Sequence, residues 1–285
     1  MKKLLIIFIL LFSAISCTPQ IKPDIEKPKV ALVLGAGASK GFAHVGVIKV
    51  LEANGIPIDM VVGTSAGSFV GSLFAYGYSG FDLQKIALSL NRADIVDISI
   101  PDSGFIKGEK IEAFINKSVK NTPIERFKIP FYAVSTDIIT GKEIAFSRGN
   151  AGMAVRASCS IPGVFKPVKI GHSYYVDGGV VSPVAVNIAR QYGANVIIAV
   201  DISGDTSTNQ PDGIVETILK SIDIMYSRIA KNELLSADII IKPKVSHIGS
   251  ADFTKRHEAI LEGEKATQES LQQIKKHIKN SNVTK

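Results

Sequence analysis

The chain has 285 residues, of which 46% are apolar, so it can bury the core of one large α/β domain or of two small ones. Its formal net charge is +7, and no stripe of Lys and Arg is interleaved with aromatic residues, which argues against a nucleic-acid-binding protein. Two cysteines exclude a disulfide framework, and five scattered histidines show no metal-ligand spacing, so we expect no metal site.

The first seventeen residues, MKKLLIIFILLFSAISC, have the order of a bacterial targeting segment. Lys2 and Lys3 give a positive start, and residues 4–12 form an apolar run too short to span a bilayer comfortably. The closing Ala-Ile-Ser-Cys is similar to a lipobox, in which the cysteine is lipidated and becomes the mature N-terminus. We therefore expect a lipoprotein signal peptide over residues 1–16 and a lipid on Cys17. The alternatives are a signal peptide cut elsewhere and an uncleaved anchor.

Removal of the signal peptide would leave a net charge of 7 − 2 = +5, which suits an anionic membrane surface. We therefore expect a membrane-anchored lipoprotein of the bacterial cell envelope. Residues 17–28 contain three prolines and mixed charges, which predicts a lipid-anchored tether. Residues 29–280 are predicted to form a single domain, followed by a polar tail over residues 281–285.

The predicted domain begins with two repeats of a strand, a loop and a helix. Residues 29–34 hold a short continuous apolar run, typical of a strand covered on both faces, and residues 56–62 are predicted to form a second buried strand. A tight glycine loop and a helix over 42–55 follow the first run, and an elbow and a helix to about Tyr76 follow the second. This order predicts a three-layer α/β/α domain with a mostly parallel central sheet.

The pattern continues less regularly along the rest of the chain. Apolar residues at helical spacing alternate with short apolar runs that are bounded by turn residues. We expect helices over 82–90, 108–120, 214–235 and 254–279, two strands within 131–147 joined at Thr140 and Gly141, a strand running into a glycine turn over 173–181, and buried strands over 195–203 and 237–243.

The second loop contains Gly63-Thr64-Ser65-Ala66-Gly67, a G-x-S-x-G pattern between a predicted strand and a predicted helix. In such an elbow the serine oxygen projects above the sheet, and the helix N-terminus favours developing negative charge. The small Gly63 and Gly67 would let the strand and the helix approach closely. Ser65 is therefore the candidate nucleophile, and a plain strand-to-helix turn is the alternative.

The first loop, LGAGASKG, contains Gly35, Gly37 and Gly41. A dinucleotide-binding loop would need a third glycine where Lys40 stands, so the G-x-G-x-x-G spacing fails. The other interpretation is an oxyanion hole made of free backbone N–H groups, which acyl transfer to Ser65 would require. The loop alone is ambiguous, and together with the elbow it favours hydrolysis.

Asp177 stands at the end of a predicted strand and is followed by Gly178 and Gly179. An aspartate before two glycines is often only a turn residue. Apolar residues flank Asp177 on both sides. Burial among them would raise the pKa of the carboxyl toward neutrality. The residues alone favour a structural turn at Asp177.

Four motifs in the order LVLGAGASKGFAHVGVIKVLEANGI, GTSAG, RASCSIPGVFKP and VDGG resemble the patatin-like phospholipases. The resemblance is closest to the bacterial branch, which is related to neuropathy target esterase domains. It is close over residues 29–202 and weak over ADFTKRHEAILEGEKAT. It implies a patatin-like fold, hydrolysis of carboxylic esters of lipids, no cofactor, and a Ser–Asp dyad without a catalytic histidine.

The resemblance assigns roles to individual residues. It makes Ser65 the nucleophile and Asp177 of the D-G-G motif its base. The amides of Gly37 and Ala38 match the loop that forms the family's oxyanion hole, and Lys40 stands where the family usually has arginine or lysine. The family loop often reads Gly-Gly-Gly, whereas this chain has alanine at positions 36 and 38, which adopts fewer backbone conformations.

An α/β-hydrolase would instead place a histidine base late in the chain, and His247 and His257 fit that order. His247 lies in a predicted loop, His257 in the middle of a predicted helix, and His44 just inside the first helix. We expect each to be structural, because none has an evident orienting group. The block around Arg156 and Cys159 either shapes the pocket or is only a helix end and a proline turn. We expect Cys159 to be a small buried residue rather than a nucleophile.

We predict a serine acyl hydrolase that cleaves phospholipids or lysophospholipids through an acyl-enzyme, with the lipid anchor holding it near its substrate. One alternative is a catalytically silent envelope lipoprotein that binds acyl chains, against which the presence of both Ser65 and Asp177 argues. Another is a nucleotide-binding oxidoreductase built on the glycine loop, against which the absent third glycine argues.

Overall fold

The computed structural model describes residues 29–98, 104–203 and 210–281. The predicted signal peptide, Cys17 and the tether lie outside the described residues, as do residues 282–285. Within the described residues, eight strands form one mixed sheet. The strands are β1 (Val30–Leu34), β2 (Met60–Thr64), β3 (Phe131–Asp137), β4 (Glu143–Phe146), β5 (Val168–Ile170), β6 (Ser173–Asp177), β7 (Val196–Val200) and β8 (Ile239–Ile241).

Most of the sheet is parallel, as predicted. The strands β3, β2, β1, β7 and β8 lie side by side in this order and run parallel. The strands β4 and β6 pair antiparallel with β3, and β5 pairs antiparallel with β6. Antiparallel strands at one side of a parallel sheet are common in α/β folds.

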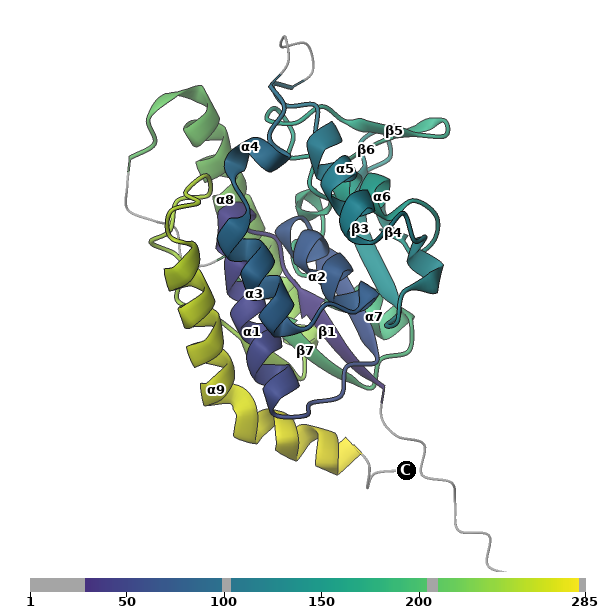
Figure 1. The fold of residues 1–285 in the computed structure, drawn as a ribbon, viewed down its shortest axis with the longest axis vertical. Coiled ribbons are helices and arrows are strands. Elements are labelled where there is room, and N and C mark those ends of the chain that lie inside the picture. Colours follow the sequence, from purple (N-terminus) through teal and green to yellow (C-terminus); the bar gives the residue numbers. More distant parts are fainter. Residues whose placement is uncertain (1–28, 99–103, 204–209, 282–285) are drawn as a thin grey trace, which may run out of the picture.

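Helices of the described residues cover both faces of the sheet (Figure 1). Alternate residues of β1 show the two faces: Leu32 and Leu34 pack in a core cluster with α1, α2 and α9, whereas Val33 packs with α7. The predicted three-layer α/β/α fold is therefore confirmed. The helices are α1 (Phe42–Ala53), α2 (Ala66–Tyr76), α3 (Gly80–Ser89), α4 (Arg92–Ile95), α5 (Glu109–Ser118), α6 (Ala151–Ser158), α7 (Val186–Gln191), α8 (Gly213–Glu233) and α9 (Arg256–Ser281).

The second strand is shorter than the sequence predicted. It begins at Met60 instead of residue 56. Pro57 has no N–H to donate to a ladder. The Asp59 carboxylate accepts the backbone N–H of Val30 at 2.8 Å, so Asp59 bonds to the start of β1 from the loop before β2.

Four short elements were missed wholly or in part by the sequence analysis. The three-residue strand β5, the four-residue helix α4 and the six-residue helix α7 carry too few residues for a periodic pattern. Of α6, only the end was foreseen, within the RASCS block. Such elements are stabilised by the sheet and helices they pack on rather than by their own sequence.

The parallel strands place two loops at the same edge of the sheet. Leu34 at the end of β1 lies opposite Gly63 near the end of β2, so residues 35–41 and Ser65 leave the sheet together. In open α/β sheets, ligands bind outside this carboxyl edge. Lys29, where the described chain begins, precedes β1 at the opposite edge.

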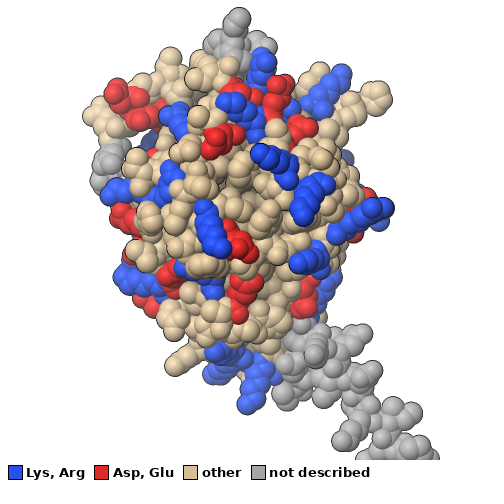
Figure 2. Space-filling view, viewed as in Figure 1, with Lys and Arg blue, Asp and Glu red and all other residues tan. Residues whose placement is uncertain are grey.

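Charged side chains of both signs are interspersed over the face that Figure 2 shows, which is the face covered by α1, α3 and α9 in Figure 1. Neither sign forms a large continuous patch in this view. Mixed charges give little long-range attraction for a single polyanion.

Candidate active site

Ser65 sits in a strained turn between β2 and α2. Its backbone has φ 54° and ψ −122°, a conformation that non-glycine residues rarely adopt. The turn brings the first residues of α2 very close to the sheet: a Cβ on Gly67 would lie 2.0 Å from the Leu34 carbonyl oxygen. A Cβ on Gly63 would lie 2.5 Å from the Gly67 carbonyl oxygen. Both glycines are therefore required by the close approach of strand and helix.

The residues that end α6 hold both Ser65 and Asp177. The Ser65 N–H donates to Ser158 Oγ at 2.9 Å, and Cys159 Sγ donates to the Ser65 carbonyl at 3.2 Å. The next residue, Ser160, accepts the Asp177 N–H through its carbonyl at 2.9 Å. Three consecutive residues thus fix the backbones of the candidate nucleophile and the candidate base relative to each other.

The sheet register brings Ser65 and Asp177 together, although they are more than a hundred residues apart in sequence. Thr64, the last residue of β2, pairs with Val134 of β3. Asp177, the last residue of β6, pairs with the next residue of β3, Ser135. One strand therefore places the end of β2 and the end of β6 at adjacent positions.

The Asp177 carboxyl is completely buried, and burial raises its pKa to about 6. The Ser65 hydroxyl, the Gly179 amide and the Tyr226 hydroxyl oppose this shift and lower the pKa. Oδ1 accepts the Gly179 N–H at 2.8 Å. Oδ2 is buried, and no partner among the described residues completes a hydrogen bond of normal geometry to it. Asp177 thus presents a free acceptor near the Ser65 hydroxyl.

The loop over residues 35–41 leaves two backbone amides free within the described part of the chain. The amides of Gly35 and Ala36 donate to Val200 and Pro183, and those of Ser39 and Lys40 donate to Ser250 and Gly37. No such acceptor occurs for the amides at positions 37 and 38 within those ranges.

Ala38 and Ser65 line the same pocket. Ala38 adopts φ 49°, the left-handed conformation that costs an alanine roughly 1 kcal/mol or more. The alanine that replaces a family glycine is therefore accommodated at the cost of local strain. Free amides at such a place can stabilise an oxyanion.

Two buried side chains support this loop. Lys40 makes an ion pair of 2.9 Å with Asp223 of α8, and Ser250 donates to the same carboxylate oxygen at 2.7 Å. His44 donates through Nε2 to the Gly35 carbonyl at 2.8 Å. Burial lowers the pKa of His44 to about 4, so its ring is neutral near pH 7. Lys40 and His44 support the loop, and neither side chain lines the pocket.

All five histidines lie within the described residues, and none of them lines the pocket that contains Ser65. His247 is exposed and bonds to Glu258 at 2.6 Å on the surface. His257 is also exposed and stands at the second position of α9, so the expectation that it lies in mid-helix was wrong. Residues 254 and 255 form a turn, and α9 begins after it, at Arg256.

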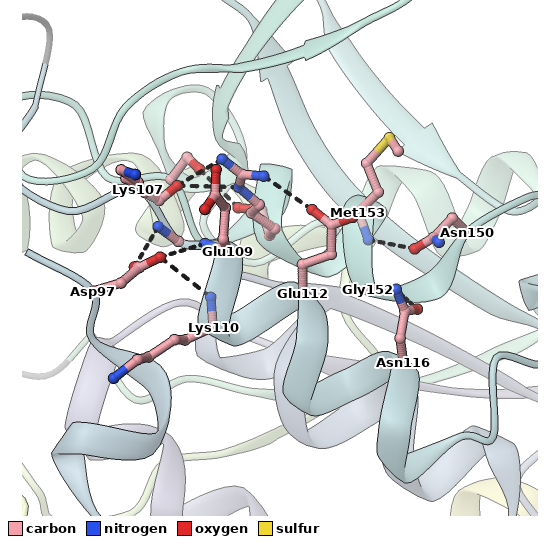
Figure 3. Close-up of polar contacts among 12 residues, drawn as sticks. Asp97, Lys107, Glu109, Lys110, Glu112, Asn116, Asn150, Gly152 and Met153 are labelled. Atoms are coloured by element: carbon pink, nitrogen blue, oxygen red, sulfur yellow. Dashed lines mark hydrogen bonds and ion pairs between the residues drawn. The ribbon is translucent and has the colours of Figure 1, made fainter. Parts of the chain in front are cut away.

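Arg156 connects α6 to α5 instead of entering the pocket. Its guanidinium donates to the Lys107 carbonyl at 3.1 and 2.8 Å and to the Glu112 carboxylate at 2.9 Å. Figure 3 shows the neighbouring polar contacts, in which the Asp97 carboxylate accepts the Glu109 N–H at the start of α5. These bonds hold α6 against α5. The segment that follows α6 then lines the pocket with Cys159, Ile161, Val164 and Phe165.

Cys159 does line the pocket, but its chemistry is not that of a nucleophile. Burial raises the pKa of its thiol, so the thiolate is not populated near neutral pH. The side chain is 8% exposed and bonds to the Ser65 carbonyl. Cys159 therefore fills space beside the elbow.

Ser65 opens into an apolar pocket of about 190 Å³. One wall is a single face of α2, from Ala66 through Phe69 and Val70 to Leu73. Because α2 rises about 1.5 Å per residue, this wall is about 10 Å long. Further lining residues come from α1 (Phe42, Val45), α3 (Leu83, Ile86, Ala87), the segment after α6 (Ile161, Val164, Phe165) and α8 (Val215, Leu219). The apolar character of this lining suits a hydrocarbon chain.

The described residues hold no group of three or more His, Cys, Asp or Glu side chains arranged to bind a metal ion. In the same ranges, no helix combines the length and apolar character that a membrane crossing requires.

Three residues that contact the candidate site were not singled out from the sequence: Ser158, Asp223 and Tyr226. Ser158 lies in the RASCS block, so its motif was noted without its role. Asp223 and Tyr226 lie on α8, which no motif marked. A helical pattern shows that one face is buried, but not what that face contacts.

Comparisons with known proteins give consistent results. A family model described as patatin-like phospholipase matches residues 32–190. An uncharacterized NTE family protein of Mycobacterium tuberculosis is 37% identical over 220 residues, which cover 74% of this chain and 61% of that protein. A lysophospholipase of Coccidioides immitis, NTE1, is 31% identical over 281 residues, which cover 86% of this chain and 18% of the relative. The chain thus spans less than two thirds of these curated relatives.

Among solved structures, VipD from Legionella pneumophila has a similar fold, with a TM-score of 0.63 at 13% identity. The match covers 87% of this chain and 67% of that chain. The type III effector protein ExoU is similar with a TM-score of 0.52 at 10% identity, over 87% of this chain and 53% of its own. At these identities the likeness concerns the fold.

Proposed function

This chain belongs to the patatin-like phospholipase family, and from that premise we propose that it is a serine acyl hydrolase that cleaves carboxylic esters of phospholipids or lysophospholipids. The observation that carries the proposal is the juxtaposition of Ser65, which lines an apolar pocket, with the buried carboxylate of Asp177. The name of the NTE1 relative, a lysophospholipase, supports the lipid substrate class.

The proposed reaction uses two residues and two amides. Asp177 Oδ2 accepts the hydroxyl proton of Ser65 while Ser65 Oγ attacks the ester carbonyl carbon. The oxyanion that forms is held by the amides of Gly37 and Ala38 and by the positive end of the α2 dipole. When the intermediate collapses, the ester C–O bond breaks, and Asp177 returns the proton to the leaving alcohol.

Water completes the cycle. It attacks the acyl-Ser65 ester while Asp177 accepts one of its protons, and collapse of the second intermediate releases the fatty acid and restores the Ser65 hydroxyl. A pKa of about 6 leaves Asp177 ionised at pH 7 yet makes it a stronger base than an exposed carboxylate. No histidine takes part in this scheme. His44 instead keeps the Gly35 carbonyl in place.

The test is hydrolysis of a soluble ester and of phospholipid vesicles by the full chain and its variants. Ser65→Ala and Asp177→Asn should each reduce kcat by roughly a thousandfold or more, because each removes one partner of a unit. Ser89→Ala and Asp252→Asn are matched controls that should retain activity, because neither side chain lines the pocket. Substantial hydrolysis by Asp177→Asn would overturn the dyad, and loss of activity in His247→Ala or His257→Ala would favour a triad.

The apolar pocket would also suit a protein that only binds acyl chains, which is the alternative function. A fluorophosphonate probe reports on an activated serine and separates the two functions. Labelling that disappears in Ser65→Ala supports the hydrolase. A folded wild-type protein that binds fatty acid but takes up no probe would support the binding protein.

We further propose that the protein is a lipoprotein of the bacterial cell envelope, processed at Cys17 and anchored to a membrane surface. The support is the order of Lys2 and Lys3, the apolar run and the Ala-Ile-Ser-Cys sequence. Radiolabelled palmitate should be incorporated into the wild type and into Cys159→Ala, but not into Cys17→Ser. Label that persists in Cys17→Ser would disprove lipidation at this residue.

A further inference from the structure

Two buried polar atoms beside the candidate site lack partners in the described part of the chain: Asp177 Oδ2 and the Tyr226 hydroxyl. A buried polar atom without a hydrogen bond destabilises the fold, because it has lost its bonds to water. Tyr226 lies on α8 and is 4% exposed, so solvent does not readily satisfy its hydroxyl. The other hydrogen bonds of the described residues therefore leave both atoms without a partner.

The Tyr226 ring lies directly on the backbone of Gly179. A Cβ on Gly179 would lie 2.2 Å from Tyr226 Cζ and 2.7 Å from its hydroxyl oxygen. The Gly179 amide itself donates to Asp177 Oδ1 at 2.8 Å. The glycine after the D-G turn therefore has a second purpose, because any side chain at this position would push the tyrosine away from the Asp177 carboxyl.

We propose that Tyr226 is a positioning residue for Asp177: its hydroxyl donates a hydrogen bond to Oδ2 of the ionised carboxylate and holds that oxygen toward Ser65. The proposal rests on the proposed role of Asp177 as the base. A carboxylate oxygen has two lone pairs, so Oδ2 can receive both the Tyr226 and the Ser65 hydroxyls. A donor to the ionised form also stabilises it, and Tyr226 accordingly lowers the pKa of Asp177.

The surrounding groups leave Tyr226 a neutral donor. Burial and the nearby Asp177 and Asp223 charges raise the pKa of its phenol, so the proton stays on the oxygen over the working range. Asp223, one turn before Tyr226 on α8, is paired with Lys40. The Cys159 thiol, which faces the same space from the end of α6, has a raised pKa and is uncharged. Asp177 is therefore the ionised group for which this phenol can serve as donor.

The experiment is the pH dependence of kcat/KM in Tyr226→Phe, which keeps the ring on Gly179 and removes only the oxygen. Loss of one hydrogen bond worth about 1–1.5 kcal/mol corresponds to about one pKa unit. The acidic limb of the profile should move to higher pH by about one unit. The loss of activity should be about tenfold at pH 5 and much smaller at pH 9. Tyr132→Phe is the matched control, because Tyr132 packs against Tyr192 and does not line the pocket.

An unchanged limb, or an equal loss at every pH, would overturn the proposal and leave Tyr226 a packing residue. A second measurement separates this outcome from failure of the proposed function. The carboxyl 13C shift of Asp177, assigned by comparison with Asp177→Asn, reports its pKa without any turnover. If the wild type hydrolyses no ester, the hydrolase proposal fails. A carboxyl that still titrates higher in Tyr226→Phe than in the wild type supports the contact with Tyr226, and an equal titration refutes it.

Discussion

At the scale of single residues, the buried Asp177 carboxyl should control how activity depends on pH. Burial raises its pKa to about 6, so below pH 6 it is increasingly protonated and can no longer accept the Ser65 proton. We expect kcat/KM for a neutral ester to fall about tenfold per pH unit below pH 6 and to be level above pH 7. His44, with a pKa lowered to about 4, is neutral over this range. Activity that stays constant down to pH 4.5 would contradict Asp177 as the base.

The same carboxyl should destabilise the folded protein near neutral pH. Its pKa rises from an ordinary value of 3.8 to about 6 in the fold, so the native state binds more protons than the unfolded chain between these values. Stability is therefore lost as the pH rises from about 4 to 6, by about 3 kcal/mol in all. Asp177→Asn, which cannot ionise, should be more stable than the wild type at pH 8 by up to about 3 kcal/mol.

Urea unfolding at pH 8 and pH 5 measures this effect, and the gain should shrink by roughly half at pH 5. Asp252→Asn is the control of opposite sign. Bonds from Thr254 lower the pKa of Asp252, so its ionised form is favoured in the fold and its removal should not stabilise. A variant at Asp177 that is less stable than the wild type at pH 8 would contradict the burial cost.

At the scale of elements, α1 and α9 pack so closely that each has a glycine at the contact (Figure 1). A Cβ on Gly263 would lie 2.0 Å from the Ala43 carbonyl oxygen, and one on Gly46 would lie 2.0 Å from the Ile260 carbonyl oxygen. In a free helix Gly→Ala stabilises by up to about 1 kcal/mol, but here the added methyl meets rigid backbone.

We expect Gly263→Ala to lower the free energy of unfolding by about 2 kcal/mol or more, measured by urea denaturation. Gly249→Ala is the matched control, since its Cβ would meet only Asp252 Cβ, at 3.8 Å. It should be nearly neutral. A stabilised Gly263→Ala would show that the two helices separate without cost.

The pocket between α1, α2 and α3 should set the preferred acyl-chain length. Ala87 of α3 lines it together with Leu83 and Ile86. The larger side chain in Ala87→Phe would fill the part of the pocket next to α3. We therefore expect kcat/KM for a dodecanoate ester to fall at least tenfold relative to a butyrate ester. Leu261→Phe, on the exposed face of α9, should keep the wild-type ratio. An equal loss for both esters would indicate general damage instead of a shortened pocket.

At the scale of the whole molecule, the start of the described chain and the pocket lie at opposite edges of the sheet. Lys29 precedes β1 at the amino edge, whereas Ser65 follows β2 at the carboxyl edge. Residues 17–28 can span at most about 40 Å when fully extended. If Cys17 carries a lipid as proposed, the length of this segment decides whether the domain can turn its pocket toward the lipid surface.

Deletion of residues 20–27 should reduce hydrolysis of vesicle phospholipid by the lipidated protein about tenfold or more. Hydrolysis of a soluble ester should not change, because the site itself is intact. A Gly-Ser segment of the original length should restore vesicle hydrolysis, since reach rather than sequence is required. Undiminished vesicle hydrolysis after the deletion would show that the tether does not limit access.

Much of the fold could be predicted because its signals are local. The strands β1 and β7 are continuous apolar runs, and Ser79 and Asp82 form a capping box that could have located the start of α3. The short β5 and α7 could not be predicted, because their stability comes from residues elsewhere in the chain. For the candidate site, the elbow and the glycine loop were visible as motifs, whereas Tyr226 sits in an ordinary amphipathic helix.

The sequence by itself determined the turns at Ser65, at residues 35–41 and at Asp177, because glycine placement and apolar flanks act on neighbouring residues. It also determined the order of strands and helices from which the sheet is built. Only the tertiary structure decided that β3 places the ends of β2 and β6 side by side, that residues 158–160 bond to the backbones of Ser65 and Asp177, and that the Tyr226 ring lies on Gly179. These contacts depend on strand register and helix packing between distant segments, which no local pattern encodes.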